Sequence, residues 1–122
     1  MKSFLLVFLG GGLGSALRYL VASAMNQYSK VLPFGTFTVN ILGCLLIGMI
    51  LGYAQRENTL TSNQTLLLAT GFCGGFTTFS AFANENLELI KNGEIFNFSV
   101  YTIGSILIGI LAVCIGFYLT NR

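Results

Sequence analysis

The side chains best suited to chemistry in this 122-residue chain lie inside apolar runs. Phe79 and Phe82 are three positions apart, so they share one face of a helix. An aromatic ring has a positive edge, and two such edges with an amide N–H can replace the water around a small anion. Asn40, in an earlier run, carries an amide with two donor hydrogens. The three residues favour an anion path, although the Asn40 amide equally suits an interhelical hydrogen bond.

Further polar groups follow these residues in the sequence. Ser80 lies between the two phenylalanines, and Tyr101, Thr102 and Ser105 lie in the last apolar run. Tyr101 and Ser105 are four positions apart and therefore share a helix face. Glu85 follows the phenylalanines on the same helix, where its charge would affect the entry of an anion if it faced a vestibule. The hydroxyl groups are candidate donors to an ion on this path.

Arg18 is a charged residue inside the first apolar run. An arginine near the centre of a bilayer costs about 2.5–3.5 kcal/mol on insertion scales. Two interpretations remain open for it. The guanidinium lines a water-filled vestibule and attracts anions, or it reaches the interface or binds carbonyl groups at a helix end.

The segment from residue 71 to residue 82 combines paired glycines and paired threonines within an apolar run. Such a pattern predicts an interrupted helix near residues 74–78. In lipid, an interrupted helix persists only when it is buried in protein or lines a cavity. The carbonyl groups freed at residues 74–78 suit a hard cation such as sodium or potassium. A simple hinge is the alternative.

The composition is that of an integral membrane protein, with 54% hydrophobic and 8% charged residues. We expect an all-α fold in which one domain, residues 1–122, crosses the cell membrane four times. The expected helices cover residues 4–25, 34–54, 64–90 and 96–120, the third being broken near residues 74–78. A net charge of +2 is too small to indicate a nucleic-acid partner.

The positive charges are almost balanced between the two ends of these helices. Lys2, Arg56 and Arg122 fall on the side of the termini, and Lys30 and Lys91 fall on the opposite side. Under the positive-inside rule, a balance of this kind gives the protein almost no preferred orientation in the membrane. We therefore predict dual topology, in which copies insert both ways and pair antiparallel.

Several function classes have weak support in the sequence. Three cysteines without histidine indicate no metal-binding motif, and the absence of histidine and aspartate argues against an acid–base enzyme. A proton-coupled small multidrug transporter would need a titratable carboxylate in the first helix, which has none. A non-transporting assembly subunit, held by its glycine pairs, would leave Asn40, Phe79 and Phe82 without a shared purpose.

Three ordered motifs carry a family resemblance. They are Gly-Gly-Gly-Leu-Gly-Ser-Ala-Leu-Arg-Tyr at residues 10–19, Gly-Thr-Phe-Thr-Val-Asn-Ile-Leu-Gly at 35–43 and Gly-Phe-Cys-Gly-Gly-Phe-Thr-Thr-Phe-Ser-Ala-Phe at 71–82. Together they resemble the CrcB/Fluc fluoride channels over nearly the whole chain. The resemblance implies an antiparallel homodimer in the bacterial inner (plasma) membrane that exports fluoride passively through two pores.

The resemblance also implies roles for single residues. It implies that Asn40, Phe79 and Phe82 line the pores, with Ser80 and Tyr101 as further polar contacts and Glu85 in a vestibule. Arg18 matches the arginine of the family's first helix. With Ser105, which shares a helix face with Tyr101, these residues make up the predicted fluoride pathway. The carbonyl groups of Gly74 and Thr77 match those that hold a structural sodium ion at the dimer centre. One departure is Ala81, which stands where many members have a threonine, the second hydroxyl residue between the two phenylalanines. Either another hydroxyl group substitutes for it, or permeation is altered.

Overall fold

The computed structural model describes residues 1–56 and 59–122, and every regular element in that part of the chain is helical. Four stretches are long and apolar enough to cross a membrane, which confirms the expected all-helical fold with four membrane-length helices. The elements are α1 (Lys2–Asn26), α2 (Phe34–Gln55), α3 (Ser62–Thr65), the π-helix η1 (Leu66–Cys73), α4 (Gly74–Phe76), α5 (Phe79–Lys91) and α6 (Ile95–Thr120).

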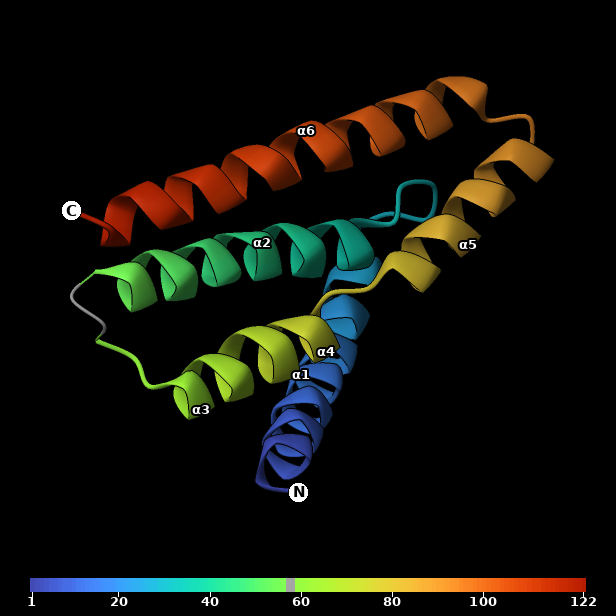
Figure 1. The fold of residues 1–122 in the computed structure, drawn as a ribbon. Coiled ribbons are helices and arrows are strands. Elements are labelled where there is room, and N and C mark those ends of the chain that lie inside the picture. The colour runs from blue at the N-terminus through green and yellow to red at the C-terminus, as the bar shows by residue number, and fades with distance from the viewer. Residues whose placement is uncertain (57–58) are drawn as a thin grey trace.

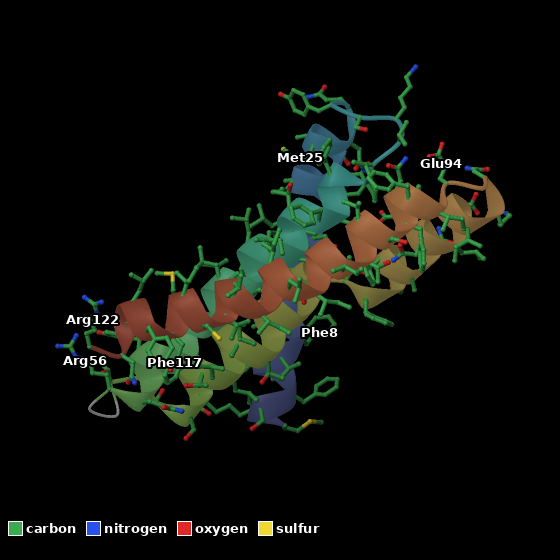
Figure 2. All side chains as sticks on the ribbon, turned by 90° about the horizontal axis from the view of Figure 1, so that it is seen from above. Phe8, Met25, Arg56, Glu94, Phe117 and Arg122 are labelled. Atoms are coloured by element: carbon green, nitrogen blue, oxygen red, sulfur yellow. The ribbon has the colours of Figure 1, made fainter. Side chains whose placement is uncertain are left out.

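The helices α2 and α6 lie side by side and run in the same direction (Figure 1). The continuous stretch of α3, η1 and α4 follows α2 in the sequence and runs in the opposite direction. It packs on α1, which crosses the bundle (Figure 1). The helix α5 then leads to the start of α6. Arg56 and Arg122 lie together at one end of the molecule, and Met25 and Glu94 lie toward the other (Figure 2).

Glycine allows the closest helix approaches. A Cβ atom added at Gly48 of α2 would collide with the Val113 carbonyl oxygen, and one added at Gly116 of α6 would collide with the Leu45 carbonyl oxygen. At the contact between α1 and η1, a Cβ atom at Gly14 would collide with the Phe72 carbonyl oxygen. The glycine pairs seen in the sequence are therefore places where one backbone packs directly on another.

The third membrane-length stretch is helical from Ser62 to Phe76 and then changes conformation. Thr77 has φ −82° and ψ 160°, and Thr78 has φ −150° and ψ 122°, so both residues are extended. The Thr78 hydroxyl oxygen then accepts the Ala81 N–H at 3.2 Å and caps the new helix α5. The helix is thus interrupted at two threonines and restarted by the second of them.

A tight turn joins α5 to α6 at the Asn92-Gly93 pair. Gly93 has φ 74°, a left-handed conformation that favours glycine. Its N–H donates to the Ile90 carbonyl at 3.0 Å, and the Glu94 N–H donates to the Leu89 carbonyl at 2.8 Å. These bonds satisfy the last carbonyl groups of α5 and bring the start of α6 back alongside it.

Candidate functional site

The centre of the site is a reciprocal pair of hydrogen bonds between Asn40 and Thr78. The Asn40 Nδ2 donates to the Thr78 carbonyl at 3.0 Å, and the Thr78 N–H donates to Asn40 Oδ1 at 2.7 Å. The amide therefore satisfies both backbone groups of the second extended residue, as a neighbouring strand would. Among residues 1–56 and 59–122, the second N–H of the Asn40 amide has no partner and stays available to a ligand. The interhelical bond and the donor role can thus coexist at this residue.

Two donors from α1 satisfy other carbonyl groups of the interruption. The Ser15 hydroxyl donates to the Gly75 carbonyl at 3.3 Å, and Arg18 Nη1 donates to the Thr77 carbonyl at 3.4 Å. Ser15 and Arg18 are three positions apart and share one face of α1. The Arg18 guanidinium is therefore bound to a helix-end carbonyl, which is one of the two interpretations open from the sequence.

The Gly74 carbonyl loses its helical partner at the interruption. An α-helix would pair it with the Thr78 N–H, which donates to Asn40 instead. Gly74 is exposed in the single chain, and an added Cβ atom would meet no atom within 4 Å. The Thr77 carbonyl oxygen accepts one bond from Arg18 and keeps a second lone pair. The carbonyl oxygens of Gly74 and Thr77 are ligands of the kind that sodium prefers.

Three aromatic rings form a row beside the interruption. The ring centroids of Phe79 and Phe82 are 5.8 Å apart, with the planes at 44°. Those of Phe82 and Tyr101 are 5.1 Å apart, with the planes at 47°. Tilted rings of this kind direct edges as well as faces toward their surroundings. Phe79 is 80% exposed in the single chain, whereas Tyr101 is 6% exposed.

A carboxylate at the end of this row joins three helices. Glu85 of α5 accepts the Tyr101 hydroxyl of α6 at 2.7 Å and the Thr36 hydroxyl of α2 at 2.5 Å, each through a different oxygen. Thr36 is 4% exposed. The two hydroxyl groups thus donate to the carboxylate. A small anion arriving here would compete with the carboxylate for the same donors.

A mainly apolar hollow of about 480 Å³ opens on the side of Asn40 and the phenylalanines. The Ser105 hydroxyl oxygen is buried and has no hydrogen-bond partner within residues 1–56 and 59–122. An unpaired buried hydroxyl is costly, so Ser105 is poised to bind a ligand or water. The predicted site residues that line this hollow are Asn40, Gly74, Thr77, Phe79, Phe82 and Ser105.

A second, more polar hollow of about 300 Å³ lies at the other end of the row. Glu85 lines it, together with Lys30 and Glu88. The Glu88 carboxylate is paired with Lys91 at 3.1 Å on the surface, in keeping with the solvated charge expected there. Glu85 therefore stands between this hollow and the Phe82–Tyr101 ring pair.

Two further predicted residues, Ser80 and Arg18, make contacts outside the aromatic row. The Ser80 hydroxyl is 3.3 Å from the Thr78 hydroxyl, and either can donate. Arg18 is absent from the residues that line the two hollows in the described part of the chain. Sequence reasoning missed Thr36, Ser15 and the role of the Thr78 backbone. Thr36 precedes Asn40 by one helical turn, and this spacing was the available signal.

The fold and site define a multi-pass membrane protein with an interrupted helix at its polar centre. The model of the family described as CrcB-like protein, Camphor Resistance (CrcB), matches residues 5–117, and the chain belongs to this family. A protein named Fluoride-specific ion channel FluC from Phocaeicola vulgatus is 50% identical over 99% of this chain and 100% of its own length. Proteins of the same name from Bacteroides fragilis (49% identical over 100% of this chain and 98% of their own) and Flavobacterium psychrophilum (42%, 100% and 99%) are also similar.

Proposed function

We propose that this protein is a fluoride-selective channel that lets fluoride leave the cytoplasm passively and so relieves fluoride toxicity. The observation that carries the proposal is the row of Asn40, Phe79, Phe82 and Tyr101, which links two hollows with amide, ring-edge and hydroxyl donors. Full-length similarity to proteins named as fluoride-specific channels supports the same ion.

The chemistry of the row explains how an ion binds and still leaves. Ring edges and a neutral amide attract an anion without a full positive charge, so the binding is strong enough to replace water and weak enough to release. Selectivity over the larger chloride ion would come from a narrow path that partly dehydrates the ion and supplies short-range donors. A membrane potential of 100 mV, negative inside, supplies about 2.3 kcal/mol per charge, which drives efflux without coupling to another ion.

The working unit in this proposal is an antiparallel homodimer. The large hollow, the exposed Phe79 ring and the Gly74 backbone all lie on one open face of the chain. A second copy related by a two-fold axis would cover this face, and the nearly balanced positive charges permit insertion both ways. The interruption of the helix would then lie at mid-membrane, beside the dimer centre.

A structural sodium ion at that centre is part of the proposal. Each copy would contribute the carbonyl oxygens of Gly74 and Thr77, and the ion would neutralise the partial negative charge that the interruption concentrates there. Replacing sodium with N-methylglucamine during purification should shift the protein from dimer to monomer on size exclusion. A dimer that persists unchanged through exhaustive sodium removal would contradict this part.

The central experiment is ion efflux from liposomes that contain the purified protein alone. Fluoride-loaded vesicles should lose their load once a potassium ionophore removes the charge imbalance, whereas chloride-loaded vesicles should retain theirs. Fluoride flux that needs no proton or sodium gradient supports a passive channel. Chloride flux equal to that of fluoride would reject the selectivity. Absence of flux of either ion would reject the channel.

A further inference from the structure

The helix α5 carries two pathway phenylalanines and the pathway glutamate, yet the other helices of its own chain bury little of it. It has 13 residues, of which only Asn86 and Leu89 are buried. It lies at the edge of the bundle and approaches its neighbours mainly at the first part of α6 (Figure 1). A helix with so little buried apolar surface depends on specific polar contacts for its position.

Asn86 makes two such contacts and lies one helical turn beyond Phe82. Its Nδ2 donates to the Phe82 carbonyl of the same helix at 3.0 Å. Its Oδ1 accepts the Thr102 hydroxyl of α6 at 3.0 Å. The side chain is 7% exposed, and neither Asn86 nor Thr102 lines the two hollows described above. The Asn86 amide therefore ties the Phe82 backbone directly to α6.

The neighbouring contact between the same helices is of a different kind. Glu85 and Tyr101 immediately precede Asn86 and Thr102, and their bond of 2.7 Å lies on the pathway. An ion that takes the Tyr101 hydroxyl as a donor weakens this bond. During each passage α5 would then lose one of its two side-chain bonds to α6, and the bond between Asn86 and Thr102 is the one that remains.

We propose that Asn86 and Thr102 are positioning residues that hold the register of α5 against α6 while the Glu85 bonds are exchanged at the pathway. The pair keeps the Phe82 ring against Tyr101 and returns Glu85 to its two donors after each ion. The link to flux rests on the proposed function, whereas the register itself does not. An interhelical hydrogen bond in a membrane changes the equilibrium between packed and separated helices by about threefold on average and up to about twentyfold.

The test compares Asn86→Leu, Thr102→Val and the double variant with the unchanged protein. We expect each single variant to lower fluoride flux by about threefold or more. The double variant should lower it no further than Asn86→Leu alone, because that change already removes the bond that Thr102→Val removes. Thr102→Ser keeps the hydroxyl and should restore flux. Ser99→Ala is the matched control, since the Ser99 hydroxyl bonds only to the Ile95 carbonyl of its own helix, at 2.9 Å.

Hydrogen exchange followed by mass spectrometry reads the register without using fluoride. In nanodiscs, Asn86→Leu and Thr102→Val should speed amide exchange in residues 79–91 and leave α2 unchanged. Normal flux with normal exchange in both single variants would overturn the proposal, as would additive losses in the double variant. If Asn86→Leu fails to assemble, the Thr102→Val and Thr102→Ser comparison decides alone. Absence of flux in the unchanged protein would refute the channel, and exchange would still test the register.

Discussion

The contact between α2 and α6 and the junction between α4 and α5 are held by opposite means. Along α2 and α6, glycines such as Gly48 and Gly116 let backbone meet backbone over most of the length of both helices. At the junction, the chain is extended and is held by single hydrogen bonds from Ser15, Arg18 and Asn40. The first region packs backbone on backbone, with a hydrogen bond across it from the Thr120 hydroxyl to the Met49 carbonyl at 2.8 Å. The second has polar contacts around the Gly74 carbonyl, which has lost its helical partner.

The difference shows how a small membrane protein can separate rigidity from ion binding. Close backbone packing uses up its contact surface and leaves no room for a ligand. A junction that is held by a few directed bonds keeps donors and oxygens partly free, because each bond satisfies one group and leaves its neighbour open. Substitutions in the first region should therefore affect folding. In the second region, loss of a ring from the aromatic row should affect conduction, and loss of a bond that holds the extended backbone should affect stability.

The largest expected effect is on folding, from Gly116→Ala in α6. The added Cβ atom would collide with the Leu45 carbonyl and lie 2.9 Å from the Met49 nitrogen, so the two helices must separate. We expect a loss of about 1–3 kcal/mol in the free energy of unfolding. Gly104→Ala on the same helix is the control, since its Cβ atom would meet nothing within 4 Å. Equal melting temperatures for both variants in detergent would contradict the packing argument.

The next largest effect is on conduction, from Phe79→Ile and Phe82→Ile at the junction. Each change removes a ring edge from the row and keeps an apolar side chain. Ring contacts are worth about 0.5–1.5 kcal/mol, so fluoride efflux should fall by up to about tenfold while the dimer stays assembled. Phe96→Ile is a matched control for Phe79, because the two rings are 79% and 80% exposed in the single chain. Normal efflux in both pathway variants would refute the ring-edge mechanism.

The smallest effect should come from Ser15→Ala, which sharpens the comparison by removing one donor from the junction. The Gly75 carbonyl would lose its partner at 3.3 Å, at a cost of about 0.5–1.5 kcal/mol. We expect a slightly lower melting temperature and nearly normal fluoride efflux. Ser23→Ala, at an exposed position of the same helix, should change neither quantity. A large loss of efflux from Ser15→Ala would place this hydroxyl in the pathway itself.

Local sequence features predicted the elements well and their mutual contacts poorly. Apolar runs of membrane length gave the four crossings, and the Asn92-Gly93 pair gave the turn before α6. The bond of Glu85 to Thr36 joins residues 49 positions apart, and the bond of Asn86 to Thr102 joins two consecutive helices. No periodicity within one helix specifies which residue of another helix it faces, so these pairs required the structure. The π-helical turns of η1 likewise have no local signal.

The pairing of Asn40 with Thr78 has a consequence for mutagenesis at this position. The Asn40 side chain takes the place of a peptide group, because its amide offers a donor and an acceptor in one plane to the extended backbone of Thr78. Aspartate lacks the donor, leucine lacks both groups, and glutamine has both but on a longer stem. In a saturation scan of residue 40, every replacement should therefore lower the amount of folded protein, even under conditions where no ion is carried.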